Sequence, residues 1–480
     1  MNTVLSNRQF RMGLWCAREL WYAIQGDGFT PDSDGGIPTG SDPSGGIPTG
    51  PKLYEAFERD QQARLEHVVA QTGPATDVFS PQSTPITRSH RISDSLVASA
   101  RAEGLEESEK GRVLYLVRPA TGVKEAATWE AAFVAYVFTA SGLPVEAVKL
   151  LHVNKSYRHE PGDGYVGLVA ETDLTMLAHG RATEVGRRLE TLSWILTLDE
   201  AEMLRQTRPC GRRRCGVCRR DRNGKTGEKA SRERLIREEA ERSGKAHIER
   251  EEIAQFIDSL NYPLRFLDFE AYNESVPTMR GVGSWEHIPV VYSLHTLDHP
   301  EGDLRHTIYA SPPGHDDREN LYRHLRSRLG ERGSIVVYGR TFERRMLYRL
   351  AEASAAPAAG RTFDVAGGVA EGVAAEAEVE RLTARLVDLS RIFRGYHFYH
   401  PRQQGSASLK AVYAALVDEG YASLGVSDGR DANALYYFLR YRFPAALEVD
   451  EGEVLERLKR YCSFDTGAMV AVFRRLCALL

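Results

Sequence analysis

The chain has 480 residues, of which 42% are hydrophobic and 27% are charged, and these fractions are typical of a soluble globular protein with two or three domains. Its formal net charge of −4 excludes a general electrostatic attraction to nucleic acid, and no apolar stretch is long enough to cross a bilayer. Residues 1–11 are polar and lack the apolar segment of a signal peptide, so we expect a cytoplasmic protein with no membrane partner.

The N-terminal part predicts one α/β domain over residues 1–220. Its first expected helix covers 5–25, where Ser6 could act as the N-terminal cap. A stretch rich in Gly, Pro, Ser and Thr at 30–51, in which Gly-Gly-Ile-Pro-Thr-Gly occurs twice, predicts a flexible insertion. The other elements expected here are a helix at 52–72, a strand at 112–117, a helix at 128–141, strands at 146–153 and 165–172, and helices within 175–205.

The C-terminal part predicts a second α/β domain over residues 261–480, joined to the first by a charged and mostly helical connector at 221–260. Its strands are expected at 263–269, 289–296, 304–310 and 334–338. Its helices are expected at 316–329, 341–353, 408–418, 431–441 and 452–475. An Ala- and Gly-rich insertion at 354–377 interrupts this domain.

Two acids lie on the first strand of the second domain. The run from Leu264 to Phe269 is apolar except for two residues, which predicts a buried strand. Asp268 and Glu270 are two residues apart, so both side chains point to the same face of that strand. Their mutual repulsion in a buried position is costly unless a cation lies between them.

Two later segments add further acids. Tyr461 and Asp465 are four residues apart on a predicted helix and therefore share one helical face. Glu343 follows Val337-Tyr338-Gly339-Arg340-Thr341-Phe342 and, taken alone, is an ordinary acid at a helix N-terminus. Acids from three separated segments suit a site for a hard divalent metal.

The order of these motifs resembles that of the DnaQ-like exonucleases of the RNase H-like fold, in the version with a tyrosine that is called DEDDy. Asp268 and Glu270 match its first motif, and Tyr461 and Asp465 match its third. Glu343 stands where most of the superfamily has Asp, and this is the departure from the pattern.

This resemblance implies a hydrolase, a metal-dependent 3′–5′ exonuclease that releases 5′-mononucleotides by a two-metal mechanism. Two Mg²⁺ or Mn²⁺ ions would be held by four acids, Asp268, Glu270, Glu343 and Asp465. Tyr461 would position the attacking water. Asp388 is left out of the metal set, because in the superfamily an acid at this place usually supports the end of the sheet.

Four of the six cysteines form a second candidate metal site. Cys210, Cys215 and Cys218 have the spacing C-x4-C-x2-C, and Cys16 lies far upstream. Four thiolates suit either Zn²⁺ or a [4Fe–4S] cluster. One early and three late cysteines resemble the iron–sulfur nucleases of the RecB and CRISPR-adaptation type, in which the cluster joins the two ends of a PD-(D/E)XK domain. That resemblance favours [4Fe–4S] over Zn²⁺. The remaining alternative is that Cys16 is a small buried core residue and the other three cysteines bind zinc alone or nothing.

The other two cysteines, Cys462 and Cys477, are expected to be core or near-core thiols, because both lie on a predicted helix.

The N-terminal domain departs from the PD-(D/E)XK pattern at the residues that bind Mg²⁺. Leu116 and Arg118 occupy the places where that family has Glu and Lys, and an apolar side chain cannot bind a hard cation. Residues 86–111 are too short and polar to supply an Asp-bearing strand before them. We therefore expect a degenerate nuclease domain that serves as a scaffold or grips nucleic acid.

A basic segment is the expected contact for phosphates. Nine Lys or Arg and one acid lie between Arg205 and Lys225, which contrasts with the acidic chain as a whole. The alternative is a solvated charged loop. The residues assigned to nucleic-acid binding are Arg212, Arg213, Arg214, Arg219 and Arg220.

The whole chain resembles an uncharacterised bacterial family that joins a RecB-like N-terminal half to a DnaQ-like C-terminal half. The resemblance is strong over 248–480, which includes Ile248-Glu249-Arg250-Glu251 and Ser334-Ile335-Val336-Val337-Tyr338, and weaker over 1–220. It implies an exonuclease acting on DNA in preference to RNA, and nuclease architecture alone suggests DNA repair or phage defence. The alternative is a nucleic-acid-binding or assembly protein with a vestigial site, and the sequence names no protein partner.

Overall fold

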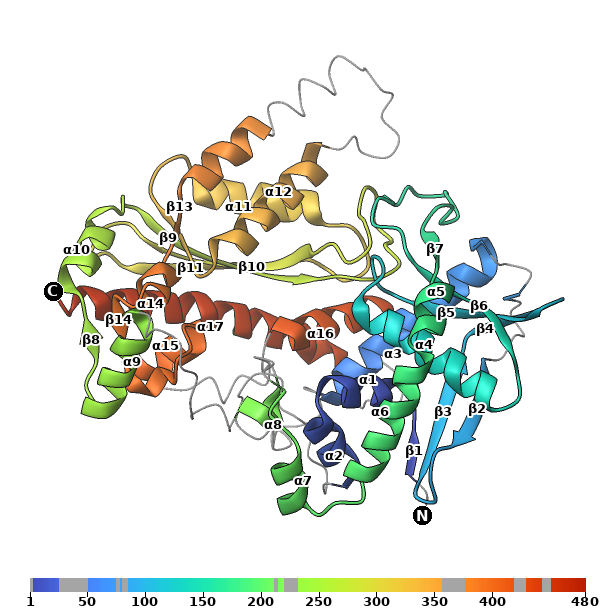
Figure 1. Cartoon of the computed structure of the whole chain (residues 1–480). Coiled ribbons are helices and arrows are strands. Elements are labelled where there is room, and N and C mark those ends of the chain that lie inside the picture. The colour runs from blue at the N-terminus through green and yellow to red at the C-terminus, as the bar shows by residue number, and fades with distance from the viewer. Residues whose placement is uncertain are drawn as a thin grey trace. The chain divides into compact units, whose positions relative to one another are not determined.

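The computed structural model describes residues 3–25, 51–74, 78–79, 85–210, 215–219, 232–355, 376–417, 429–442 and 450–480. The chain divides into two compact units. The first comprises Met1–Ser41, Glu58–Gly227 and Glu274–Glu286, and the second comprises Asp42–Phe57, Glu228–Asn273 and His287–Leu480. Both units combine helices with sheets, so the expected α/β class is confirmed (Figure 1). Within the described ranges, no helix is both long and apolar enough to span a bilayer.

The first unit contains a four-stranded sheet of order β4-β5-β6-β7 and a three-stranded sheet of order β1-β3-β2. Its strands are β1 (Thr3–Leu5), β2 (Ile86–Arg91), β3 (Leu96–Ala102), β4 (Gly104–Ser108), β5 (Gly111–Arg118), β6 (Val145–Val153) and β7 (Val169–Asp173). Its helices are α1 (Asn7–Trp15), α2 (Ala17–Gln25), α3 (Pro51–Thr72, from Glu58 onward in this unit), α4 (Glu125–Ala140), α5 (Thr175–Gly180), α6 (Ala182–Ile195), α7 (Glu200–Gln206) and α8 (Gly216–Arg219).

The central strands of the four-stranded sheet, β5 and β6, are covered on both faces. Leu114 and Leu116 of β5 belong to the core that includes α4, whereas Tyr115 and Val117 pack in a core that includes Leu65 of α3. This alternation follows from the two-residue period of a strand. It explains why β5 is apolar at consecutive positions, as expected for a strand covered on both sides.

The predicted helix at 5–25 is two helices that meet at Cys16, whose backbone is extended. Ser6 caps the first of them, as predicted. Its hydroxyl accepts a hydrogen bond from the Gln9 backbone, and the Gln9 side chain accepts one from the Ser6 backbone. This reciprocal pair satisfies two backbone donors at the start of α1.

Strands β2, β3 and β4 occupy residues 86–108, although that segment is short and polar, and none of the three carries an Asp. Most side chains of β2 and β4 are exposed. Without a buried face these two strands show no apolar alternation, which is the signal by which a strand is found from sequence.

The second unit contains a five-stranded sheet of order β11-β10-β9-β12-β13 and a two-stranded sheet of order β14-β8. Its strands are β8 (His247–Ile248), β9 (Leu264–Tyr272), β10 (Ile288–Leu297), β11 (Leu304–Ala310), β12 (Ile335–Val337), β13 (Leu386–Asp388) and β14 (Phe398–Tyr399). Its helices are α9 (Arg232–Ser243), α10 (Arg250–Asp258), α11 (Arg318–Leu329), α12 (Arg340–Ala355), α14 (Ser390–Arg394), the 3-10 helix η2 (Pro401–Gln403), α15 (Leu409–Leu416), α16 (Gly429–Tyr441) and α17 (Glu451–Cys477).

Strand β9 is the centre of the five-stranded sheet. It pairs antiparallel with β10 and parallel with β12. Helices α11 and α12 cover one face of the sheet and α17 runs along the other (Figure 1). Leu267 and Phe269 point to the α11–α12 side, whereas Phe266 packs on Phe473 of α17 with ring centroids 5.6 Å apart. Asp268 and Glu270 are two and four residues after Phe266 in the strand, so their side chains lie on the same side of the sheet, toward α17.

The two predicted insertions, at 30–51 and 354–377, fall almost wholly outside the described residues.

Candidate functional site

The site begins with the two acids of β9. Asp268 lies directly opposite Ser293 of β10, and Glu270 lies opposite Val291. The Glu270 side chain is buried, although it belongs to a residue type that is rarely buried without a partner. A buried and a half-buried acid side by side on one strand face are therefore the first sign of a functional site.

The third acid comes from α12. Glu343 lies in the first turn of this helix and is 3% exposed, and no hydrogen-bond donor reaches its Oε2 atom among the described residues. Its carboxyl and that of Asp268 lie close enough to share a hydrogen bond. The longer side chain of Glu, compared with the expected Asp, therefore does reach the acids of β9.

Asp388, at the end of β13, holds the turn before α12 in place. Its carboxylate accepts hydrogen bonds from the backbone N–H groups of Gly339 and Arg340, at 3.1 and 3.2 Å, and from the backbone and hydroxyl of Ser390. Through these bonds Asp388 holds the turn that leads to Glu343, and its negative charge raises the pKa of Glu343. Its omission from the metal set stays a prediction.

The remaining residues come from α17. Tyr461 is buried, and the Lys410 Nζ lies 5.1 Å from its ring centroid. The negative charge of Asp465 acts on both Asp268 and Glu270 and raises the pKa of each. The structure thus brings the five sequence-predicted site residues of the second unit into one neighbourhood.

Cys462 is also part of this neighbourhood, which the sequence reasoning missed by treating it as a core thiol. Its Sγ donates to Oδ2 of Asp268 at 3.5 Å, and ligand atoms of Cys462, Asp268 and Glu270 all lie within 4.8 Å of one another. The available signal was its position three residues before Asp465, which puts both on one helical face. Cys477, the other predicted core thiol, is exposed, because it lies on the last turn of α17.

Burial dominates the electrostatics of the cluster. It raises the pKa of Asp268, Glu270 and Glu343 well above the ordinary values, and the repulsion among the acids raises each pKa further. Lys410 opposes this effect at Glu270. Among the described residues, the repulsion of the four acids outweighs the opposing charge of Lys410, so the cluster can hold hard divalent cations such as Mg²⁺ or Mn²⁺. The orphaned Oε2 of Glu343 fits such an ion.

A polar network anchors α17 beside the acids. No pattern in the sequence predicted this network. The Thr466 hydroxyl is hydrogen-bonded to the Ser293 hydroxyl at 2.6 Å and to His295 Nδ1 at 2.8 Å. Nε2 of His306 is hydrogen-bonded to the same Ser293 at 2.9 Å, and the two imidazoles stack with centroids 4.3 Å apart. Because Thr466 directly follows Asp465, this network fixes the rotation of α17 that turns Asp465 toward β9.

The four cysteines predicted as a metal site do converge in the first unit. All four Sγ atoms lie within 4.8 Å of one another. Sγ of Cys16 is 3.5 Å from that of Cys218 and 3.6 Å from that of Cys215. All are free thiols, and burial raises the pKa of Cys16 above its ordinary value and that of Cys215 to about 11. Four clustered thiols, three of them buried, form a candidate site for a thiophilic metal at this spacing.

An ion network surrounds Arg118, one of the two positions at which the sequence departs from the PD-(D/E)XK pattern. Leu116 is fully buried, and the Arg118 guanidinium binds Glu103 at 2.9 Å and Glu130 at 2.5 Å. Arg11 adds a second contact to Glu130, at 3.1 Å. Burial opposes ionisation of Glu130, but Arg118 and Arg11 lower its pKa below the ordinary value. The chain itself therefore supplies the cation that these two buried acids need.

Four of the five arginines predicted to bind nucleic acid lie outside the described residues: Arg212, Arg213, Arg214 and Arg220. The side chain of the fifth, Arg219, is not described either.

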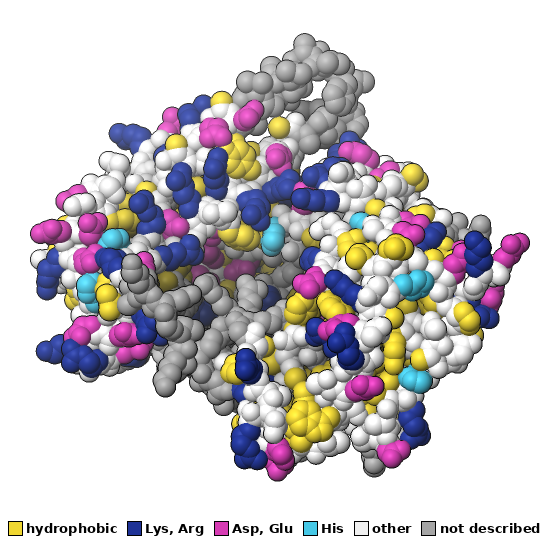
Figure 2. Space-filling view, viewed as in Figure 1, with side chains coloured by type: hydrophobic (Ala, Val, Ile, Leu, Met, Phe, Trp, Pro, Cys, Tyr) yellow, Lys and Arg dark blue, Asp and Glu magenta, His cyan; other side chains and the backbone are white. Residues whose placement is uncertain are grey.

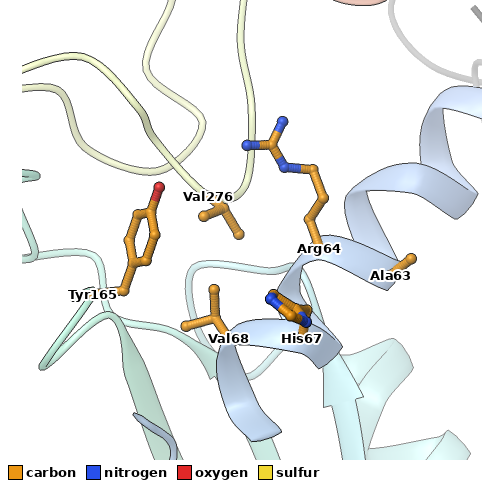
Figure 3. Close-up of a pocket in the computed structure, with 6 residues that line it drawn as sticks. All are labelled: Ala63, Arg64, His67, Val68, Tyr165 and Val276. Atoms are coloured by element: carbon orange, nitrogen blue, oxygen red, sulfur yellow. The ribbon is translucent and has the colours of Figure 1, made fainter. Parts of the chain in front are cut away.

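Two pockets lie away from the acid cluster. One, of about 360 Å³, belongs to the first unit, and in it Tyr165 and Arg64 face each other with Val276 between them (Figure 3). Arg64 is 3.7 Å from Glu274 there, so its charge is partly neutralised. The other, of about 340 Å³, lies on α12 and is lined by Arg340, Thr341, Arg344, Arg345 and Tyr348.

Comparison with known proteins gives one match. The family model described as Domain of unknown function (DUF2779) matches residues 265–408. That range includes three of the clustered acids, Asp268, Glu270 and Glu343, and ends before α17. No curated protein and no solved structure matches the chain.

Proposed function

We propose that the chain is a metal-dependent 3′–5′ exonuclease whose active site is the acid cluster of the second unit. The observation that carries the proposal is the convergence of half-buried Asp268 with buried Glu270 and Glu343 around a carboxylate oxygen to which the described residues offer no donor. Such a cluster is unstable without a cation. The acids come, in chain order, from a central strand, from a helix after a parallel strand and from a late helix. This order supports the resemblance to DnaQ-like exonucleases of the RNase H-like fold.

Each residue then has a separate task. Asp268, Glu270, Glu343 and Asp465 would hold two Mg²⁺ or Mn²⁺ ions, which when bound supply charge stabilisation for phosphodiester hydrolysis. Tyr461, buried under Lys410, orients the water that attacks the terminal phosphodiester. Lys410 favours the ionised form of Glu270, and its own positive charge offsets part of the negative charge met by an approaching phosphate.

The helix that carries Glu343 also offers a surface for phosphates. Arg340, Arg344 and Arg345 are exposed around the pocket on α12. Figure 2 shows Lys and Arg side chains gathered on the part of the surface that α11 and α12 form. Arginine suits this task because its planar donors match phosphate oxygens. We infer that this surface contacts the backbone of a nucleic-acid strand whose 3′ end reaches the acids.

The test uses purified full-length chain and single-stranded DNA and RNA labelled at the 5′ end. With Mn²⁺ we expect a ladder that shortens one nucleotide at a time, and with EDTA we expect none. Asp268→Asn and Glu343→Gln should abolish shortening. The matched control is Glu352→Gln, because Glu352 lies on the same helix but is exposed and forms an ion pair with Arg349, at 3.0 Å. Shortening that persists in Asp268→Asn contradicts the proposal.

A non-catalytic nucleic-acid-binding protein is the second candidate. The arginine-lined pocket on α12 favours it, because that surface could bind phosphates with or without a working acid cluster. It predicts retention of labelled DNA that weakens steeply with salt and with Arg345→Ala. Binding without metal-dependent shortening would select this candidate over the exonuclease.

A further inference from the structure

The cysteine cluster of the first unit joins segments that are far apart in sequence. Cys16 lies at the junction of α1 and α2, where the backbone is extended, and Cys210 follows α7. Cys215 precedes the short helix α8 and Cys218 lies within it. Arg18 independently ties the same two regions together, since its guanidinium donates to the Thr207 hydroxyl and the Leu204 carbonyl, both at 2.9 Å.

The distances between the sulfur atoms distinguish the two metal groups that four thiolates accept. Four sulfurs bound at about 2.3 Å to one tetrahedral zinc ion are about 3.8 Å from one another. In a [4Fe–4S] cluster each thiolate binds a different iron at a corner, so the four sulfurs lie much farther apart than around one ion. The separations of 3.5 and 3.6 Å, with every pair within 4.8 Å, fit a single ion and leave no room for four irons.

Backbone N–H groups point at the sulfurs as they do around metal-bound thiolates. The N–H of Glu19 donates to Cys16 Sγ, that of Cys218 donates to Cys215 Sγ, and that of Cys210 donates to Cys218 Sγ, each at 3.4 Å. Such donors compensate the charge of thiolates in a buried site and orient them. Two residues separate Cys215 from Cys218, and the pair lies at the start of a short helix. This is the ligand spacing of a structural zinc site.

A negative charge beside the cluster also favours a cation. The Glu19 carboxylate is 3.9 Å from Cys215 Sγ and adds negative charge beside the thiols. A disulfide is the alternative that would remove two thiols without a metal, but a bonded pair is about 2.05 Å apart, well below the separations found here.

We propose that Cys16, Cys210, Cys215 and Cys218 bind one tetrahedral Zn²⁺ ion, and not the [4Fe–4S] cluster that the resemblance to iron–sulfur nucleases implies. The ion closes the first unit by tying the α1–α2 junction to the segment after α7. Zinc has no redox chemistry at this site, so the metal contributes folding free energy and nothing to catalysis. The proposal is independent of the exonuclease activity of the second unit.

The experiment measures metals in the full-length chain purified without oxygen. We expect about one zinc and no iron per chain, a protein without visible colour, and a thiolate-to-metal absorption band after exchange with Co²⁺. Cys16→Ser should lose the zinc, whereas Cys477→Ser, which changes an exposed cysteine outside the cluster, should keep it. Zinc retained in Cys16→Ser would overturn the four-ligand assignment.

A second measurement needs no variant and covers the case in which Cys16→Ser fails to fold. A thiol-specific mercurial is added to the wild-type chain, and the released zinc is followed with a coloured indicator. Release in proportion to thiols modified supports the proposal. Iron with visible absorption, or metal-free protein lacking free thiols because disulfides have formed, would overturn it.

Discussion

Both units bury acidic side chains, but they neutralise them in different ways. In the first unit, the guanidinium of Arg118 lies between Glu103 and Glu130, within 2.9 Å of each. In the second, burial and mutual repulsion raise the pKa of Asp268, Glu270 and Glu343, and the charge of Lys410 opposes this shift at Glu270. The first arrangement is complete as it stands, whereas the second needs a cation from solution. Acids that a protein buries without its own counter-charge are therefore the better guide to a metal site.

The largest expected effect comes from removing the internal cation. Arg118→Met leaves Glu103 and Glu130 buried without their partner and should lower the free energy of unfolding by about 3–5 kcal/mol. The control is Arg112→Met, which breaks a more exposed pair with Glu107 and should cost less than about 1 kcal/mol. Urea denaturation measures both. Equal losses in the two variants would mean that the Arg118 network is no more important than a surface ion pair.

The next largest effect is the stabilisation that a divalent cation gives when it binds the acid cluster. Mn²⁺ at about 100 times its dissociation constant should stabilise the wild-type chain by about 2.7 kcal/mol, because it binds the folded acid cluster and not the unfolded chain. The stabilisation should vanish in Asp268→Asn and persist in Glu352→Gln. Thermal denaturation with and without Mn²⁺ measures it. A stabilisation of the same size in Asp268→Asn would show that Mn²⁺ binds at another site.

Substitutions in the acid cluster and in the Arg118 ion network should also change the free energy of unfolding in opposite directions. In EDTA, Asp268→Asn removes one of the mutually repelling buried acids and should raise the free energy of unfolding, whereas Arg118→Met lowers it. A destabilised Asp268→Asn in metal-free buffer would show that this acid is already neutralised within the chain.

The pH dependence of the metal-free protein follows from the same acids. Their folded-state pKa values are raised above the unfolded values, which are about 3.9 for Asp and 4.3 for Glu. Their contribution to stability is thus fully present below about pH 4 and is lost as the pH rises through the folded-state pKa values. Unfolding free energies measured against pH in EDTA should show this loss, and saturating Mn²⁺ should abolish it.

The smallest effect concerns a third kind of buried ionisable group, one that stays neutral. Burial, with a further contribution from His306, lowers the pKa of His295 to about 4, against about 6.5 when unfolded. Its contribution to stability is present above pH 6.5 and is lost as the pH falls toward 4. His295→Gln should flatten this part of the pH profile, whereas His299→Gln, at an exposed position, should leave it unchanged.

The sequence predicted the helices and the central strands of the second unit well, because both faces of β9 are buried and its apolar run is unmistakable. It also predicted the approach of Glu343 and Asp465 to the acids of β9. It failed at β2 and β4, whose side chains are mostly exposed, because a strand without a buried face has no apolar period. It likewise could not predict the Glu103–Arg118–Glu130 network, since no local pattern relates a strand to a helix and a distant turn.

Cys462 shows a different limit of sequence reasoning. A cysteine on the buried face of a helix is most often a small apolar core residue. Only the three-dimensional approach of β9 to α17 reveals that its sulfur contacts the Asp268 carboxylate.

The length of α17 has a practical consequence for work with fragments. The family match ends at residue 408, yet the sheet face that carries Phe266 and Val336 is covered by residues of α17 such as Met469 and Phe473. A recombinant fragment cut at the limits of the match would expose that face and lose Asp465. We expect such a fragment to aggregate, so the smallest unit that can be expressed for assay extends to the end of α17.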